Sequence, residues 1–308
     1  MSRPLLSIAV GDQHEHLADA MTATRLWRPF PLRRVQFSNG NLMYVAPRTA
    51  VPDSIDVLWS GTGSVGENVL ALSVAMDCLW RANPRIRATV IVPYLPYSRS
   101  SRVEDGSSLG AAALFRLLDA VPGIERYAAF ELHSPETVGF SRRPVHELSI
   151  LDDVSEWART LAGVDAVVAP DRGRAGSCAA LAQSLGVSGD VVLKRRDGHD
   201  DRARRVDVER PALKGRTVLV YDDEFTTGAT VRAALDTLGR SGASTVHVLV
   251  ARTFASPDVV KECAQHPLVG SLATTSLSDA AAAGVFRDHG LAVVPVPLAL
   301  QRLAVRHD

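Results

Sequence analysis

Two stretches of the chain repeat one pattern of hydrophobic and polar positions. Each begins with a short apolar run rich in β-branched residues and passes through a turn of Gly, Thr and Ser. Apolar residues at helical spacing follow, and a second apolar run closes the stretch. The first stretch spans residues 55–94 and the second spans 216–251. We therefore predict one β-α-β unit in each half of the chain, with parallel strands and right-handed crossovers.

Apolar residues in the two helical segments indicate which helix faces are buried. In the first segment they are Leu70, Val74, Met76, Cys78 and Leu79, and in the second they are Val231, Ala234, Leu235 and Leu238. Between the two units, helices are predicted over 111–123 and 177–186, and strands over 127–133 and 164–173. Strands that alternate with helices predict an α/β fold throughout.

The size of the chain favours two domains. It has 308 residues, of which 46% are hydrophobic, which is enough for a sizeable core. We place the boundary near 147–152, so that the domains cover 1–148 and 149–308. Residues 291–308 are predicted as a strand and a short helix, and this helix is a candidate to pack back on the N-terminal domain.

Charge and cysteine content narrow the class of protein. Lys+Arg and Asp+Glu number 34 each, so the net charge supports neither nucleic-acid binding nor an anionic membrane surface. Cys78, Cys178 and Cys263 form no metal-binding spacing and are expected to be reduced thiols. No run approaches the ~18 apolar residues of a membrane span, and the first residues are not typical of a signal peptide. We expect a cytoplasmic protein with neither nucleic acid nor membrane as a partner.

A candidate phosphate site lies in the sequence VLVYDDEFTTGATV, residues 218–231. A turn between a strand and a helix leaves free N–H groups at the helix N-terminus, where a phosphate can bind. The short residues of this turn are Thr226, Thr227, Gly228, Ala229 and Thr230. Asp222 and Asp223 at the strand end can accept hydrogen bonds from sugar hydroxyls or hold hydrated Mg²⁺. The alternative is a threonine-capped helix beside two solvated aspartates.

Two further segments of the same half carry related features. The sequence PDRGRAG (170–176) also joins a strand to a helix, and can cradle a second anion with Asp171 near a metal. The segment KRRDGHDDRARR (194–205) holds six basic and three acidic residues. A mobile basic loop there would stabilise charge during phosphoryl transfer, whereas the alternative is a solvated surface loop.

The N-terminal half offers weaker signals. Residues 90–106 end a strand and then present Arg99 and Arg102, which can pair with a polyphosphate or remain surface charges. His133 follows another strand and can ligate a metal or contact a phosphate, or simply pack. The sequence FSNG (37–40) alone predicts a turn.

Taken together, these segments resemble the ribose-phosphate pyrophosphokinase (PRPP synthetase) family. That family carries, in order, FSDGE, PYxxYARQDR, DLHS, PDxGG, a KxR loop and DDxxDTGGT. The matching segments are FSNGN (37–41), PYLPYSRSSR (93–102), ELHS (131–134), PDRGR (170–174), KRR (194–196) and DDEFTTGAT (222–230). The resemblance covers essentially the whole chain. It implies two phosphoribosyltransferase-like domains, each a mostly parallel sheet flanked by helices.

The resemblance also implies a reaction and a set of site residues. ATP would donate its β,γ-pyrophosphoryl group to the C1 hydroxyl of ribose 5-phosphate, with Mg²⁺ as cofactor. Thr226–Thr230 would hold the 5-phosphate, and Asp222 and Asp223 would face the ribose. Lys194 and Arg196 would close over the transition state, with His133 also in the catalytic set. The pyrophosphate loop would comprise Asp171, Arg172, Gly173 and Arg174. The metal contacts would be His133 and Asp171. The ATP site would comprise Phe37, Asn39, Asn41, Arg99, Ser100, Arg102 and His133. In the family, the phenylalanine corresponding to Phe37 packs on adenine from a neighbouring subunit, which implies a homo-oligomer (dimer or hexamer).

Departures from the family pattern cluster at the nucleotide end. Asparagines replace the two carboxylates of FSDGE, and Ser100 and Ser101 replace the Gln and Asp of YARQDR. Arg174 replaces a glycine, so it is either strained or an added cation; Thr226 and Ala229 alter the sugar-phosphate loop. Three hypotheses follow: an active pyrophosphokinase for ribose 5-phosphate or a related pentose phosphate, a catalytically weak regulatory homologue, or a transferase that consumes the activated sugar.

Overall fold

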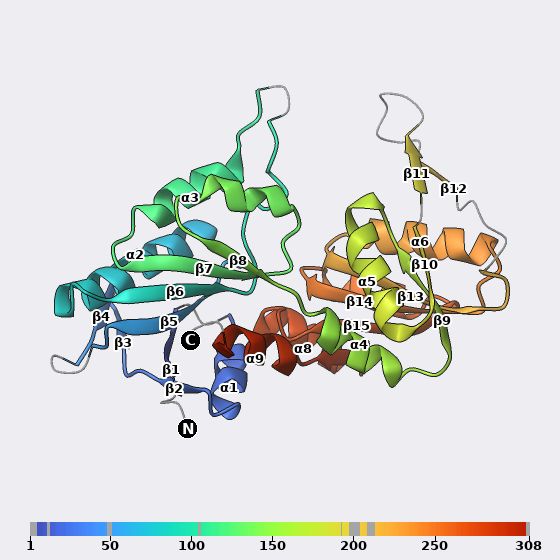
Figure 1. Ribbon diagram of the computed structural model, residues 1–308. Helices are drawn as coiled ribbons and strands as arrows, with labels where there is room; N and C mark the ends of the chain where they lie inside the picture. Colours follow the sequence, from blue (N-terminus) through green and yellow to red (C-terminus); the bar gives the residue numbers. More distant parts are fainter. Residues whose placement is uncertain are drawn as a thin grey trace. The chain divides into compact units, whose positions relative to one another are not determined.

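The computed structural model describes residues 5–10, 13–47, 51–103, 106–191, 193–196, 204–207 and 213–305. The chain divides into two compact units. The first comprises Met1–Ser149 with Pro297–Asp308, and the second comprises Ile150–Val296. Each unit is built around one six-stranded sheet (Figure 1). The prediction of an α/β fold with mostly parallel sheets flanked by helices is confirmed.

The sheet of the first unit has the order β2-β1-β5-β6-β7-β8, and each pairing in it is parallel. Its strands are β1 (Leu5–Val10), β2 (Trp27–Pro29), β5 (Ser54–Trp59), β6 (Arg87–Val92), β7 (Ile124–Phe130) and β8 (Val145–Leu148). The helices are α1 (Glu15–Ala23), α2 (Val65–Ala82), α3 (Gly110–Asp119), α9 (Pro297–Val305) and the 3₁₀ helix η1 (Pro135–Phe140). Strands β5 and β6 are buried at every position but the first, as expected for a parallel sheet covered on both faces.

The second unit repeats this architecture with the order β10-β9-β13-β14-β15-β16, again parallel throughout. Its strands are β9 (Val164–Ala169), β10 (Ser188–Val191), β13 (Thr217–Phe225), β14 (Thr245–Thr253), β15 (Val269–Thr275) and β16 (Ala292–Val294). Its helices are α4 (Leu151–Arg159), η2 (Arg172–Arg174), α5 (Ala175–Leu185), α6 (Ala229–Arg240), α7 (Pro257–Ala264) and α8 (Ala280–Asp288). Both predicted β-α-β units are therefore present.

Two antiparallel strand pairs stand outside the six-stranded sheets. Strands β3 (Arg33–Gln36) and β4 (Leu42–Val45) form a hairpin whose turn contains the FSNG sequence. Strands β11 (Leu193–Arg196) and β12 (Arg204–Asp207) also pair, with Lys194 opposite Val206. The prediction of a loop over 194–205 is therefore wrong at both ends, because strand pairing satisfies the backbone there. Residues 197–203 lie outside the described part of the chain.

Burial corrects one helix assignment. The side chain of Leu70 in α2 is 61% exposed, although its spacing suggested a buried position. The buried face of this helix is instead formed mainly by Ala71, Leu72, Ala75, Met76 and Leu79. Apolar residues surround most of this helix, so the periodicity alone did not define which stripe meets the sheet. Among the described residues, no helix combines the length and the apolar character needed to span a membrane.

Candidate functional site

The candidate site of the second unit lies where two neighbouring strands end. Strands β9 and β13 are adjacent and parallel, so their carboxyl ends share one edge of the sheet. Strand β9 leads through Asp171 into η2 and α5, and β13 leads through residues 226–228 into α6. Ligands of open α/β sheets bind at such edges. The two corners that the sequence proposed as anion sites are therefore brought together.

The loop after β13 is shaped by Gly228. This residue is the N-cap of α6 and adopts φ +74°, a left-handed conformation that favours glycine. An added Cβ atom would lie 2.8 Å from Nη1 of Arg232 and 2.9 Å from Cγ1 of Val259. Ala229 is the first residue of α6, so its N–H group belongs to the helix N-terminus. The replacement of glycine by alanine at 229 is compatible with this geometry.

Asp171 organises the loop after β9. Its Oδ1 accepts hydrogen bonds from the backbone N–H groups of Gly173 (2.9 Å) and Arg174 (3.3 Å). The residue is half-buried, while Arg172 and Gly173 are exposed. An aspartate in this position caps the short helix and fixes the turn. The loop is thus held by its own carboxylate.

Arg174 is neither strained nor an exposed cation. Its φ of −96° and ψ of 0° lie in the right-handed helical region, so the strain considered from the sequence is absent. The side chain is 5% exposed, and its Nε lies 3.7 Å from Oδ1 of Asp223. Arg174 therefore ties the loop after β9 to the acidic end of β13.

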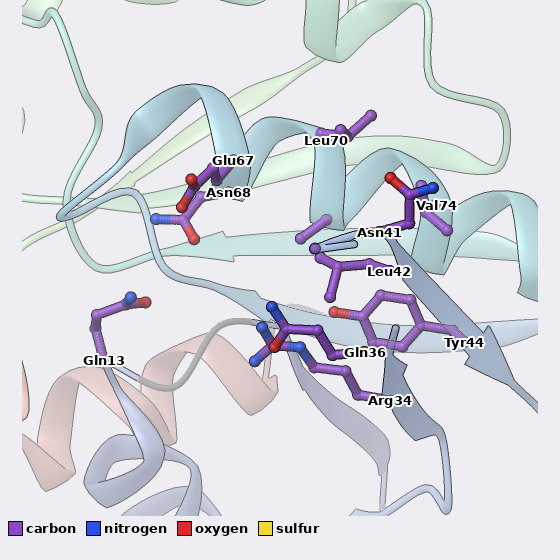
Figure 2. A pocket seen from close by; sticks show the side chains of 12 residues that line it. Gln13, Arg34, Gln36, Asn41, Leu42, Tyr44, Glu67, Asn68, Leu70 and Val74 are labelled. Atoms are coloured by element: carbon purple, nitrogen blue, oxygen red, sulfur yellow. The ribbon is translucent and has the colours of Figure 1, made fainter. Parts of the chain in front are cut away.

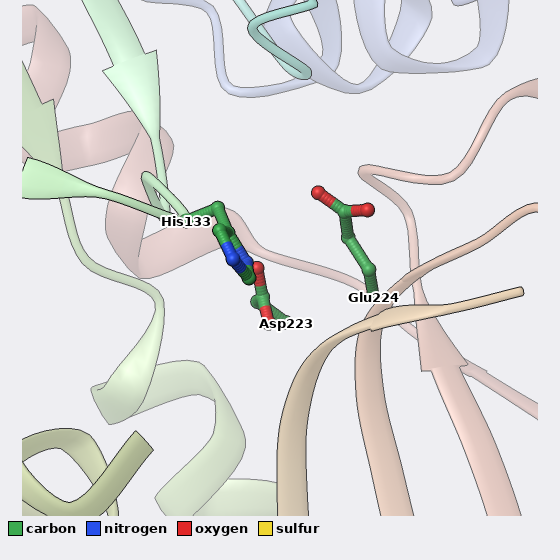
Figure 3. Close-up of side chains that lie close together, drawn as sticks. All are labelled: His133, Asp223 and Glu224. Carbon is green, nitrogen blue, oxygen red and sulfur yellow. The ribbon is translucent and has the colours of Figure 1, made fainter. Parts of the chain in front are cut away.

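Three consecutive acidic residues, Asp222, Asp223 and Glu224, are buried at the end of β13. Figure 3 shows the last two of them, Asp223 and Glu224. The strand continues to Phe225, so these side chains belong to the sheet and not to the following loop. The backbone N–H of Asp223 donates to Oδ1 of Asp222 at 2.9 Å. Burial, followed by the charge of Asp223, raises the pKa of Asp222 well above its ordinary value, and Asp171 adds to the effect. Sequence reasoning overlooked Glu224, although a third acidic residue before an apolar Phe was visible.

Three basic residues are relevant to this site, two predicted from the sequence and one not. Lys194 and Arg196 lie on β11, and their catalytic role stays a prediction. Arg232, in the first turns of α6, was missed by the sequence reasoning. Its Nη2 donates to the carbonyl oxygen of Thr227 at 2.6 Å, within the proposed phosphate loop. The signal was a basic residue near a helix N-terminus, where the helix dipole disfavours positive charge.

In the first unit, the β3–β4 hairpin presents Phe37, whose side chain is 48% exposed. The turn is closed by hydrogen bonds from Phe37 N–H to Asn41 O (2.9 Å) and from Asn41 N–H to Asn39 Oδ1 (3.1 Å). The side-chain oxygen of Asn39 is thus engaged by its own turn.

A pocket of about 520 Å³ separates this hairpin from α2 (Figure 2). Of the residues predicted to bind ATP, Asn41 lines it, but Phe37, Asn39, Arg99, Ser100, Arg102 and His133 do not. Its other polar lining residues include Gln13, Arg34, Gln36, Glu67 and Asn68. None of these five was predicted, because they come from separate elements and form no local motif.

Three of the remaining predicted nucleotide contacts follow β6, and the fourth, His133, follows β7. Arg99 is exposed. The Oγ of Ser100 donates to Ser108 O at 2.9 Å and accepts from Gly110 N–H at 3.0 Å, so it supports the start of α3. Nη2 of Arg102 lies 3.2 Å from Oε1 of Glu136. His133 is half-buried just after β7.

The fold, with two strand-to-helix corners at one edge of the second sheet, is that of a phosphoribosyltransferase-type protein. The family model described as the phosphoribosyl transferase domain matches residues 146–261. A second model, described as the N-terminal domain of ribose phosphate pyrophosphokinase, matches residues 6–121. A solved structure of phosphoribosylpyrophosphate synthetase from Mycobacterium smegmatis superposes with a TM-score of 0.81 at 24% identity, covering 99% of both chains. That similarity establishes the fold.

Curated relatives extend the comparison. The chain is 31% identical to a ribose-phosphate pyrophosphokinase of Streptomyces coelicolor over 244 residues, which cover 77% of this chain and 74% of the relative. It is 24% identical to ribose-phosphate pyrophosphokinase 2 of Schizosaccharomyces pombe, with 90% and 87% covered. The chain belongs to the ribose-phosphate pyrophosphokinase family, whose members are transferases. The family resemblance seen in the sequence is confirmed.

Proposed function

We propose that this protein transfers the pyrophosphoryl group of ATP to the C1 hydroxyl of ribose 5-phosphate or a related pentose 5-phosphate. The products would be AMP and a phosphoribosyl pyrophosphate-type sugar. Family membership supports the reaction class. One observation carries the proposal: the Thr226–Thr230 loop at the N-terminus of α6 directly follows β13, whose last residues include the buried carboxylates of Asp222 and Asp223.

The loop over 226–230 would bind the 5-phosphate. Backbone N–H groups at the first turn of α6 supply donors, and the threonine hydroxyls add more. Asp222 and Asp223 would accept hydrogen bonds from the ribose hydroxyls. Because these carboxylates are buried at the strand end, they would orient the sugar and keep C1 in one position relative to the incoming phosphorus.

The loop after β9 would receive the pyrophosphoryl group, with Asp171 and His133 as Mg²⁺ contacts. The donor chemistry fits, because Mg²⁺ prefers carboxylate oxygens and Asp171 supplies a half-buried carboxylate at the start of this loop. When bound, Mg²⁺ would neutralise charge on the polyphosphate. Lys194 and Arg196 would add positive charge to the transferring group, and Arg99 would contact the ATP phosphates.

The nucleotide base would meet Phe37 of a neighbouring subunit. The exposure of this aromatic side chain at a hairpin turn supports that proposal, because a base can stack on an accessible ring. We accordingly propose a homo-oligomer, a dimer or a hexamer, in which the nucleotide site lies near a subunit interface.

A second candidate is a catalytically weak homologue that regulates an active synthetase by co-assembly. It is favoured by the local engagement of Asn39 in its own turn and of Ser100 at the start of α3. Both positions belong to the nucleotide end of the family pattern, and both side chains already serve the fold.

One assay separates the candidates. The protein is incubated with Mg²⁺, ATP and each of several pentose 5-phosphates, and phosphorus NMR follows AMP and a new sugar pyrophosphate. Formation of both products supports the pyrophosphokinase. Binding of ATP or sugar phosphate without turnover across the panel would refute it and favour the regulatory homologue. Consumption of added phosphoribosyl pyrophosphate with a nucleobase acceptor would instead indicate a transferase.

A further inference from the structure

Arg232 is built into the phosphate loop through two hydrogen bonds. It is the fourth residue of α6, and its backbone N–H donates to Gly228 O at 2.9 Å. Its guanidinium turns back toward the helix N-terminus, as helical side chains do. Nη2 donates to Thr227 O at 2.6 Å, and Nη1 lies 3.2 Å from Oε2 of Glu262 on α7. The side chain thus joins the loop to the neighbouring helix.

We propose that Arg232 is a positioning residue for the phosphate of the sugar substrate, acting through the peptide bond between Thr227 and Gly228. The proposal rests on the proposed function of the 226–230 loop. A trans peptide is planar, so its C=O and N–H groups point in opposite directions. By holding the oxygen of Thr227 on one side, Arg232 directs the N–H of Gly228 to the other side.

The alternative orientation of this peptide would impair anion binding. Glycine is the residue around which a peptide plane can rotate at low cost, since it accepts both signs of φ. Rotation would turn the Thr227 oxygen, a partial negative charge, toward a bound phosphate. The short hydrogen bond to the charged guanidinium opposes that rotation. Arg232 therefore selects the loop conformation that presents a donor to the phosphate.

The charge of Arg232 gives independent support. A positive side chain in the first turns of a helix opposes the helix dipole, and α6 has no acidic residue in its first turn. Glu262 offsets part of this charge from outside the helix. A phosphate dianion bound at the same helix end would offset the unfavourable interaction between the Arg232 charge and the helix dipole.

Packing fixes the arrangement. The guanidinium lies over Gly228, where an added Cβ atom would come within 2.8 Å of Nη1. Cγ1 of Val259 would lie 2.9 Å and Sγ of Cys263 3.2 Å from the same added Cβ atom. The side chains of Arg232, Val259 and Cys263 therefore occupy the space that a side chain at position 228 would need.

The test compares Arg232→Met, which keeps the length and removes the donors, with Arg240→Met as a matched control. Arg240 is in the last turn of the same helix and bonds Thr237 Oγ1, away from the loop. Calorimetric titration with ribose 5-phosphate and with inorganic phosphate gives the affinities. We expect Arg232→Met to weaken both ligands about tenfold, which corresponds to about 1.4 kcal/mol, and Arg240→Met to leave both within twofold.

Turnover distinguishes positioning from general damage to the fold. Arg232→Met should raise KM for ribose 5-phosphate about tenfold while kcat and the KM for ATP stay within about twofold. Equal rises in both KM values, or unchanged affinity for both ligands, would overturn the inference.

If Arg232→Met does not fold, Arg232→Lys serves, because a lysine can reach only one of the two acceptors. It should weaken binding about threefold relative to Arg240→Lys, and equal affinities would overturn the inference.

The wild-type titration tests the proposed function separately. Wild-type protein that binds inorganic phosphate but not ribose 5-phosphate would contradict ribose 5-phosphate as the substrate, and the Arg232 comparison is then decided by the phosphate titrations. Wild-type protein that binds neither ligand would overturn both proposals.

Discussion

The tight packing around Gly228 makes the Gly228→Ala variant a direct test of the loop geometry. Two separate penalties are expected. The residue has φ +74°, and a left-handed conformation costs alanine about 1–2 kcal/mol. The new methyl group would lie 2.8 Å from Nη1 of Arg232 and 2.9 Å from Cγ1 of Val259, and overpacking of this kind typically costs about 1–3 kcal/mol. We expect a loss of about 3 kcal/mol in the free energy of unfolding.

Two other glycines separate these contributions. Gly186 has φ +69°, but no neighbouring atom lies within 4 Å of an added Cβ, so Gly186→Ala should lose only the conformational part, about 1–2 kcal/mol. Gly176 lies in α5 with ordinary φ and nothing within 4 Å, so Gly176→Ala should gain about 0.5–1 kcal/mol. Urea unfolding followed by circular dichroism gives all three values. A Gly228→Ala variant no less stable than Gly186→Ala would refute the claim that the guanidinium and Val259 close over Gly228.

Four further substitutions probe the acidic and basic residues of the site. If Lys194 stabilises the transition state, Lys194→Ala should lower kcat at least about a hundredfold, measured as AMP formation by phosphorus NMR, with little change in unfolding free energy. Asp171→Asn should raise the Mg²⁺ concentration at half-maximal rate about tenfold, which is about 1.4 kcal/mol; it keeps an acceptor oxygen for the loop N–H groups. Arg174→Met should destabilise the protein by about 3 kcal/mol in urea, because the buried carboxylate of Asp223 loses a cationic partner. Asp222→Asn should be more stable than wild type near neutral pH without ligands, with the difference shrinking toward pH 4 in urea titrations.

The sign of the last effect follows from the raised pKa of Asp222. Below the unfolded pKa of about 4, Asp222 is protonated in both the folded and the unfolded chain, so its ionisation costs the wild type nothing. As pH rises through the raised folded pKa, the wild type loses free energy of unfolding, whereas the asparagine side chain of the variant has no charge to bury. A difference in unfolding free energy between the two proteins that stays constant from pH 4 to neutral pH would contradict the raised pKa of Asp222.

Contrary results for the other three substitutions are equally specific. An unchanged kcat would remove Lys194 from the transition state, and an unaltered Mg²⁺ titration would remove Asp171 from the metal site. For the ion pair, addition of Asp223→Asn to Arg174→Met should restore part of the lost stability. No recovery would show that the arginine acts through packing alone.

Strand and helix positions in both halves followed from the periodic pattern, because buried parallel strands and amphipathic helices leave strong local signals. The corners at 170–176 and 222–230 could be found for the same reason, since each joins a strand to a helix with small residues. The family resemblance then added a reaction that local patterns could not supply.

Other features depend on side-chain direction and could not be read from the sequence. Arg174 was ambiguous until its φ and its approach to Asp223 were known. Leu70 could not be assigned to the exposed side of α2 while apolar residues surrounded that helix. Arg232 contacts Thr227 by folding back along its helix, which spacing alone does not reveal.

The membership of α9 in the first unit affects how the chain folds during synthesis. Helix α9 lies against α1, and Nη2 of Arg302 donates to Ser149 O at 2.6 Å. All of residues 150–296 must leave the ribosome before this helix does. The second unit can therefore be completed first, although it is translated later, while the first unit waits with the surface that α9 covers still open. A substitution or truncation that disrupts α9 near residue 300 should therefore destabilise the first unit, whose synthesis began first.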